Sequence, residues 1–327
     1  MNIAAILPAY CTRAHILAVL RAIGPEVAAI YVVDDACPQG TGDYVRAQCH
    51  DARVRVIRHT ENQGVGGAVM SGYRAALADG MDILVKIDSD GQMDPALLMG
   101  FVAPIRDGKA DYTKGNRFFD LESVRVMPRV RLAGNAALSL LAKLSSGYWN
   151  IFDPTNGYTA IHASVARQLP FEKISRGYFF ETDMLFRLGT LRAVVADVPM
   201  RAVYGSETSH LQIRKIVFEF LFKHARNATK RIFYNYYLRD MSLASLELPA
   251  GLTLVLFALV HGALRWSASV ASGVPTTAGS VMLAALPALA GLQLLLSFIG
   301  HDVAAVPQQP IHPSLTRLAP PCAPALP

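Results

Sequence analysis

The chain has 327 residues, of which 52% are hydrophobic and only 17% are charged, and its net charge is +6. A soluble domain usually carries about 25% charged residues. This composition excludes a disordered chain, a collagen-like repeat and a coiled coil, and it argues against a protein that is soluble throughout.

The first two hundred residues alternate short apolar runs with helical patterns, which predicts an α/β fold. Most of the runs are continuously apolar, as in parallel strands buried on both faces. We therefore expect an open, mostly parallel, doubly wound sheet, with ligands at the carboxyl ends of its strands. The expected strands are 3–7, 28–33, 54–57, 83–87 and 110–113, and the expected helices are 13–23, 66–78, 95–106 and 130–145.

Acidic residues follow two of these strands. Asp88 and Asp90 stand two residues apart after 83–87, a spacing that suits a hard divalent cation shared with diphosphate oxygens. The alternative for this segment is a solvated turn. Asp34 and Asp35 end an earlier strand, where a carboxylate accepts hydrogen bonds from a nucleoside or caps the next helix.

Three further segments carry candidate chemistry beside a structural alternative. The glycine-rich stretch 62–68, with Gly64, opens a helix and allows either close approach of a phosphorylated ligand or tight helix–sheet packing. Arg117 follows the strand at 110–113 and is suited to a bidentate phosphate contact. The segments 152–158 and 179–184 place acids among turn residues and apolar residues.

The C-terminal third has the pattern of a membrane anchor. Residues 248–264 and 278–300 contain no Asp, Glu, Lys or Arg, and each is long enough to cross a bilayer. The preceding stretch 201–240 carries eight basic and three acidic side chains, a charge expected to meet lipid headgroups and not nucleic acid. The last 27 residues include seven prolines and are expected to form a disordered or extended tail.

These observations predict four segments. Residues 1–206 form the catalytic domain, 207–240 form basic amphipathic helices at the membrane interface, 241–300 form two membrane spans, and 301–327 form the tail. The N-terminus lacks a signal peptide, so the head is expected on the cytoplasmic face of the inner membrane. The four cysteines show no metal-binding spacing, and we expect reduced thiols.

The ordered set PAY, VVDD, NQGVGGA, DSDGQ, KGNRF, FDPTNGY and FFETDML resembles family-2 glycosyltransferases with the GT-A fold, over about residues 3–300. With its C-terminal spans, the chain is most similar to the branch that acts on polyprenyl phosphates. The resemblance implies a nucleotide-sugar site holding Mg²⁺ or Mn²⁺. It implies nucleoside contacts from Pro8, Tyr10, Asp34 and Asp35, donor contact at Gly64, metal and diphosphate contacts from Asp88, Asp90 and Gln92, a phosphate contact from Arg117, and an acceptor contact from Arg201.

The resulting hypothesis is inverting transfer of one hexose from a UDP- or GDP-sugar to a polyprenyl phosphate. A processive polysaccharide synthase and a non-catalytic, membrane-anchored adaptor that binds nucleotide sugars are the alternatives. Relatives usually continue PAY with Asn-Glu-Glu where this chain has Cys11-Thr12-Arg13, and they often have an acid at the position of Gln39, so the base preference stays open. Small residues in the second span, Gly279, Ala284, Ala285, Ala288 and Gly291, fit a homo-oligomer.

Overall fold

The computed structural model describes residues 1–119, 129–201 and 213–318. The chain divides into two compact units, one of Met1–Ala228 with Pro307–Pro327 and the other of Thr229–Val306. The expected boundary at residues 206/207 and the motif residues between 202 and 212 lie outside the described residues.

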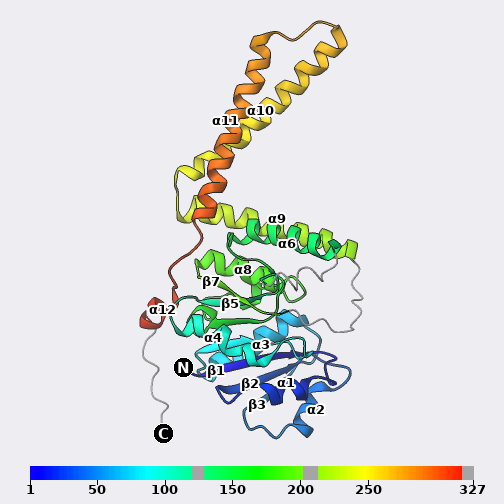
Figure 1. Cartoon of the computed structure of the whole chain (residues 1–327), viewed down its shortest axis with the longest axis vertical. Helices are drawn as coiled ribbons and strands as arrows, with labels where there is room; N and C mark the ends of the chain where they lie inside the picture. Colours follow the sequence, from blue (N-terminus) through cyan, green and yellow to red (C-terminus); the bar gives the residue numbers. More distant parts are fainter. Residues whose placement is uncertain (120–128, 202–212, 319–327) are drawn as a thin grey trace. The chain divides into compact units, whose positions relative to one another are not determined.

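The first unit is built on one seven-stranded sheet with the order β3-β2-β1-β4-β6-β5-β7 (Figure 1). Strand β6 runs antiparallel to both of its neighbours, β4 and β5, whereas all other pairs are parallel. The strands are β1 (Ile3–Ala9), β2 (Val27–Asp34), β3 (Val54–Arg58), β4 (Ile83–Lys86), β5 (Tyr112–Asn116), β6 (Thr159–His162) and β7 (Val195–Pro199).

Helices cover both faces of this sheet, which confirms the doubly wound architecture. Alternate residues of β1 point to opposite faces. Leu7 joins a buried cluster with residues of α1 and α4, whereas Ile6 lies against Gly72 of α3. The helices of this unit are α1 (Ile16–Ala22), α2 (Thr41–Gln48), α3 (Gly64–Ala78), the 3-10 turn η1 (Pro95–Leu97), α4 (Leu98–Arg106), α6 (Arg129–Ser146), α7 (Ala163–Ala166), the 3-10 turn η2 (Phe171–Lys173), α8 (Phe180–Leu191), α9 (Ile213–Phe233, whose last residues belong to the second unit) and α12 (His312–Leu318).

The five expected strands are present as β1–β5, with shifted ends. Strands β6 and β7 and helices α2 and α8 were not among the expected elements. The two missed strands lack a continuous apolar run, because β6 begins with Thr159 and ends with His162, and β7 is interrupted by Asp197.

The C-terminal segment differs from the expected tail. Residues 301–304 continue α11, and α12 follows at His312–Leu318. The backbone N–H groups of Ile311 and His312 donate to the buried Asp111 carboxylate, and His312 Nδ1 lies 2.8 Å from Asp111 Oδ1. A buried carboxylate that needs donors therefore fixes the start of α12, because helix N-termini supply unpaired N–H groups.

His162 lies beside this contact, and its ring stacks on that of His312 with 4.4 Å between the ring centres. Its Nδ1 accepts from the backbone N–H of Ser164 and so caps α7, a role that needs Nδ1 unprotonated. Burial first, and then the neighbouring His312, lower the pKa of His162 to about 4, while Asp82 and Asp111 act against this and Arg167 adds to it.

We predict that acid weakens the fold through His162. Because its pKa lies below the ordinary 6.5, the unfolded chain binds the proton first, and stability falls as the pH drops from 6.5 towards 4, by as much as about 3 kcal/mol. His162→Asn keeps a capping acceptor that does not titrate, so its thermal stability should depend less steeply on pH over this range. Equal pH profiles for the two proteins would contradict the prediction.

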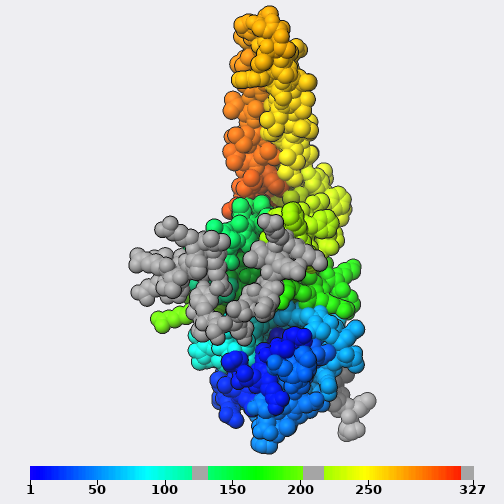
Figure 2. Space-filling view, turned by 90° about the vertical axis from the view of Figure 1, so that its right-hand side faces the viewer, coloured from blue at the N-terminus to red at the C-terminus, as the bar shows by residue number. Residues whose placement is uncertain are grey.

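The second unit is a helical hairpin of α10 (Leu243–Ser272) and α11 (Ala278–Ala304), preceded by the π-helical segment η3 (Tyr234–Arg239). Figure 2 shows the two long helices packed side by side along their length. Both are long and apolar enough to cross a membrane. Gly291, which was expected to serve self-association, instead packs on Gly251 of α10, where an added Cβ would lie 2.9 Å from the Gly251 carbonyl oxygen.

A buried ion pair closes the base of this hairpin. Arg231 donates to Asp302 at 2.6 and 3.0 Å, and the hydroxyl of Tyr236 donates to the same carboxylate at 2.6 Å. Both charged side chains are at most 5% exposed. Removal of one partner strands a buried charge, which is costlier than loss of an exposed pair.

We therefore expect Asp302→Ala to destabilise the protein in detergent by about 3–5 kcal/mol. Asp240→Ala is the matched control, because its pair with Arg239 leaves Asp240 52% exposed, and it should cost about 1 kcal/mol or less. Thermal unfolding of both variants measures the difference. Equal losses would show that the Arg231–Asp302 pair does not hold the hairpin base.

Candidate functional site

A cleft of about 1220 Å³ opens at the carboxyl ends of β1, β2 and β4, where ligands of doubly wound sheets bind. The loops after these strands line it together with the start of α3, residues of α8 and Phe220 of α9. Six of the residues expected from the sequence line this cleft: Pro8, Tyr10, Asp35, Gly64, Asp88 and Asp90.

Asp35 holds the glycine loop in place. Its carboxylate accepts hydrogen bonds from the backbone N–H groups of Gln63 and Gly64, both at 2.8 Å, and lies 2.7 Å from His59 Nδ1. His59 Nε2 in turn lies 2.9 Å from the Ser71 hydroxyl of α3. Asp35 therefore orders the loop and still borders the cleft.

Gly64 also needs the conformation that only glycine adopts easily. Its φ is +78°, and a Cβ there would lie 2.5 Å from the carbonyl oxygen of Arg176. The neighbouring Gly66 N–H donates to that same oxygen. The glycine-rich stretch thus packs tightly on the segment before α8 and also borders the cleft. Tight packing and close approach of a ligand are therefore compatible roles for this motif.

Ser89, between the two acids of the DSD turn, ties this turn to the loop after β1. Its buried hydroxyl donates to the Pro8 carbonyl at 2.6 Å and bonds the Thr12 hydroxyl at 2.9 Å. Asp90 accepts from the backbone N–H of Gln92 at 2.9 Å, which closes the turn. The two loops therefore form one wall of the cleft.

A buried lysine lies at the floor of the cleft. Lys86 Nζ is 2.8 Å from Asp88 Oδ1 and 3.3 Å from Glu181 Oε1, and it donates to the Gly157 carbonyl at 3.0 Å. Burial favours the neutral amine, but the two carboxylates outweigh it and raise the pKa of Lys86. Burial and the nearby Asp88 raise the pKa of Glu181, against the opposing effect of Lys86. A Cβ at position 157 would meet the ends of the Lys86 and Asp88 side chains, so a larger residue there would have to displace this ion pair.

Four of the residues expected at the site do not line the cleft. Both carboxylate oxygens of Asp34 accept backbone N–H groups, from Cys37 and Gly42, each at 2.7 Å, so Asp34 holds the start of α2. Gln92 lies beyond the cleft lining, in the turn closed by Asp90. Arg201 is exposed at the edge of the described segment.

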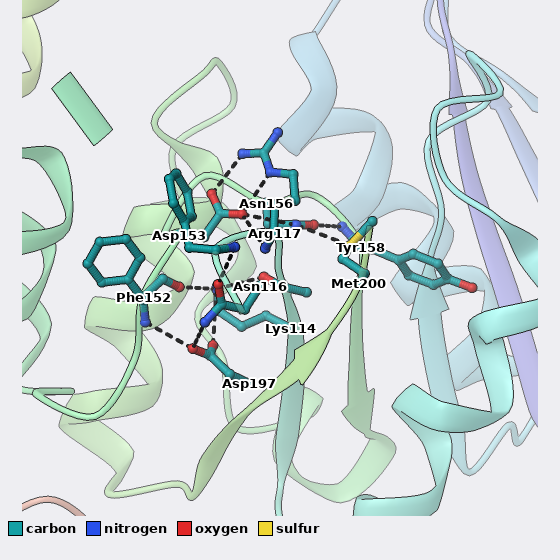
Figure 3. Close-up of polar contacts among 11 residues, drawn as sticks. Lys114, Asn116, Arg117, Phe152, Asp153, Asn156, Tyr158, Asp197 and Met200 are labelled. Carbon is teal, nitrogen blue, oxygen red and sulfur yellow. Dashed lines mark hydrogen bonds and ion pairs between the residues drawn. The ribbon is translucent and has the colours of Figure 1, made fainter. Parts of the chain in front are cut away.

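Arg117 also lies outside the cleft lining, because it pairs with Asp153 (Figure 3). Its Nε and Nη2 atoms each lie 2.7 Å from a carboxylate oxygen of Asp153, which is 1% exposed and has a φ of +52°. Burial opposes ionisation of Asp153, but Arg117 and Lys114 outweigh it and lower its pKa. The fork of donors expected to hold a phosphate is therefore engaged with the loop 152–158.

A second buried lysine supports this loop. Lys114 donates to the Phe152 carbonyl at 2.5 Å and lies 3.2 Å from Asp197 Oδ1, while Asn116 donates to Asp197 Oδ2 (Figure 3). Burial first, and then Arg117, lower the pKa of Lys114, whereas Asp197 and Asp153 raise it by a smaller amount. The KGNR segment thus orders the loop that brings Gly157 to the cleft floor.

No role was expected for Lys86, and Glu181 was expected only as one of the acids in the candidate segment 179–184. The sequence signal for Lys86 is a lysine inside an otherwise apolar strand, which needs buried carboxylates as partners. The partner Glu181 is 95 residues away in the chain, so spacing does not identify it.

Comparison with known proteins agrees with this geometry. The sequence profile of Glycosyl transferase family 2 matches residues 5–169. An undecaprenyl-phosphate mannosyltransferase of Micrococcus luteus is 34% identical over 208 residues, which cover 62% of this chain and 84% of that protein. A dolichol-phosphate mannosyltransferase of Pyrococcus furiosus is 24% identical over 68% of this chain and 62% of its own length.

Among solved structures, the glucosyl-3-phosphoglycerate synthase of Mycobacterium tuberculosis in complex with uridine diphosphate superposes with a TM-score of 0.52. The match covers 70% of this chain and 79% of that one at 22% identity. The sheet and its helices thus form a GT-A-like nucleotide-sugar transferase fold. The chain belongs to glycosyltransferase family 2.

We predict that Lys86→Met lowers the free energy of unfolding of the protein by about 3–5 kcal/mol, because it leaves the carboxylates of Asp88 and Glu181 without the cation that they share. Thermal unfolding and UDP or GDP affinity are the measurements. Lys109→Met is the control, since Lys109 is 76% exposed, and it should change stability by about 0.5 kcal/mol at most. If Lys86→Met matches the parent protein in both measurements, Lys86 does not organise the floor of the cleft.

Proposed function

We propose that this glycosyltransferase moves a single hexose from a UDP- or GDP-sugar to a polyprenyl phosphate, with inversion, at the cytoplasmic face of a membrane. The observation that carries the proposal is the convergence, in one cleft, of the Asp35-anchored glycine loop, the DSD turn and Phe220 of a basic, apolar-faced helix. The named activities of the polyprenyl-phosphate relatives support the same substrate classes.

The donor binds along the loops after β1, β2 and β4. Tyr10, which is 50% exposed at the cleft, and Pro8 face the nucleoside. Asp35 and Gly64 border the same part of the site, whereas Asp34 acts indirectly by holding the loop before α2. The chain's departures at Cys11-Thr12-Arg13 fall in this region, which keeps both UDP and GDP as candidate carriers.

Asp88 and Asp90 fit a hard cation, Mg²⁺ or Mn²⁺, because they are two positions apart in the chain and both carboxylate side chains line the cleft. In the part of the chain that is described, no three His, Cys, Asp or Glu side chains gather into a metal cluster. Two carboxylates leave most of a cation's coordination sites to substrate phosphate oxygens. An ion held by Asp88 and Asp90 would neutralise charge on the departing diphosphate. The backbone N–H of Gln92 closes the turn that presents Asp90.

The acceptor phosphate needs no general base. A phosphate monoester has a second pKa near about 6, so at neutral pH it is mostly ionised and its oxygen attacks the anomeric carbon directly. The nucleoside diphosphate leaves as the glycosidic bond breaks. Pairing of Glu181 with Lys86 fits this scheme, because Glu181 then organises the floor and does not take a proton. Arg201 is assigned to the acceptor phosphate, and Arg117 to ordering the loop 152–158.

Helix α9 brings the cleft to the lipid. Its exposed side chains include Val217, Phe218, Leu221 and Phe222, at 43–75% exposure, with basic residues beside them. Such a face lies in the headgroup layer, where the polyprenyl phosphate is held. The hairpin α10–α11 anchors the chain, and the basic residues before it favour the cytoplasmic side.

The test is a transfer assay on the detergent-purified full chain with undecaprenyl phosphate and labelled UDP-glucose, UDP-N-acetylglucosamine or GDP-mannose. We expect label in the lipid phase that disappears with chelator and returns with Mg²⁺ or Mn²⁺. Asp90→Ala should lower turnover by about 100-fold or more, since it removes an electrostatic stabiliser of the transition state.

Asp107→Ala is the control, because Asp107 lies on the surface with its side chain 42% exposed, and it should retain activity. Full metal-dependent turnover by Asp90→Ala would overturn the assignment of the metal site. Nucleotide-sugar binding without transfer from any of the three donors would overturn the transferase proposal for them and favour an adaptor.

A further inference from the structure

Two thiols meet at the edge of the cleft. Cys11 follows β1 and Cys37 follows β2, and these strands are parallel neighbours whose last residues, Ala9 and Asp34, are paired. The backbone N–H of Cys11 donates to Cys37 Sγ at 3.1 Å. Cys11 itself lines the cleft, so this pair belongs to the wall that faces the ligand.

Cys37 has the environment of a stabilised thiolate. Its Sγ lies 3.1 Å from the Thr41 hydroxyl, at the start of α2. Burial raises the pKa of the Cys37 thiol, but hydrogen bonds from Thr41 and from the backbone of Cys11, Thr41 and Gln39 outweigh it and lower the pKa. Thiols at helix N-termini that accept such bonds are the nucleophilic ones.

Cys11, in contrast, is accessible to reagents in solution. It is exposed, whereas Cys37 is 8% exposed. Its φ of +58° is unusual for a residue with a side chain. Partial desolvation and the adjacent Cys37 raise the pKa of the Cys11 thiol, so the reactive thiolate of Cys11 is its minor form.

We propose that Cys11 and Cys37 form a reversible redox modification site. Peroxides oxidise the two thiols to a disulfide, and small thiols reduce that disulfide again. The state of this pair controls entry of the donor. The reduced thiols of the structure are its open state. Disulfides of reducing compartments are typically transient and redox-sensing, which fits a switch and not a structural bridge.

The chemistry balances in two steps. Cys11, as thiolate, attacks one oxygen of hydrogen peroxide, the O–O bond breaks, and the released hydroxide takes up a proton as water, which leaves Cys11 as a sulfenic acid. The Cys37 thiolate then attacks the Cys11 sulfur, the S–S bond forms and the S–O bond breaks, and hydroxide again leaves as water. Two thiols and one peroxide thus give one disulfide and two waters, and a small thiol reverses this by exchange.

Closure changes the wall of the cleft. A disulfide requires an S–S distance of about 2.05 Å, shorter than a thiol contact, so the loops after β1 and β2 must approach each other. The residue after Cys11, Thr12, bonds Ser89 in the DSD turn, and the Cys37 N–H bonds Asp34. The displacement therefore reaches both acidic turns. We expect UDP or GDP affinity to fall at least tenfold, a step that rests on the proposed function, whereas formation of the disulfide does not.

The experiment treats the full chain in detergent with hydrogen peroxide, blocks remaining thiols, and maps disulfides by peptide mass spectrometry. UDP and GDP binding is measured by calorimetry before oxidation, after it, and after reduction. Cys49→Ser is the matched control, because Cys49 lies at the end of α2, and it should behave as the parent protein. Cys11→Ser and Cys37→Ser are each compared before and after peroxide, and the nucleotide affinity of either variant should not change on treatment.

A Cys11–Cys37 peptide together with a reversible loss of binding supports the proposal. Absence of that peptide while other cysteines are oxidised overturns it, and so does loss of binding that persists in Cys11→Ser. If the reduced protein binds neither nucleotide, the proposed function fails, and the mass spectrum still decides whether the thiol pair closes.

Discussion

The constraint on which the site depends is a lysine buried inside the central sheet. Lys86 is 1% exposed in β4, so its charge needs partners, and it finds Asp88, Glu181 and the Gly157 carbonyl. These three groups come from the DSD turn, from α8 and from the loop before β6. One buried cation thus fixes three distant parts of the chain around the floor of the cleft, because a buried charge without partners costs too much free energy.

The same requirement explains why β6 lies where it does. The strand pairs antiparallel with β4, opposite Lys86, and the loop that leads into it carries Asp153, Asn156 and Gly157. Arg117 and Lys114 on the β5 side hold this loop through Asp153 and the Phe152 carbonyl. The arginine that resembles a phosphate ligand in sequence therefore acts first as a structural partner. The loop that it holds gives Thr155 to the cleft lining and the Gly157 carbonyl to Lys86.

Sequence patterns predict those parts of the structure that depend on local properties. Continuous apolar runs identify β1–β5, the uncharged runs identify both long helices, and the acids at strand ends identify most of the cleft. Pairings across long sequence distances have no such signal, and they explain what was missed: β6 between β4 and β5, the Lys86–Glu181 pair, and α12 on Asp111. The proline-rich tail suggested an extended chain, but a buried carboxylate that needs N–H donors makes part of it helical.

Helix α9 shows how one element both lines the cleft and exposes an apolar surface. One side presents Phe218 and Phe222 at 75% and 70% exposure, whereas the other packs into the first unit. There Asn227 donates to Asp183 at 2.9 Å, and the other oxygen of Asp183 accepts from the backbone N–H of Ser175, just before the cleft residues Gly177 and Tyr178. Phe220 on the same helix lines the cleft itself. Because side chains three and four residues apart share a helix face while their neighbours point elsewhere, a single turn of α9 exposes large apolar side chains on one side and lines the cleft on the other.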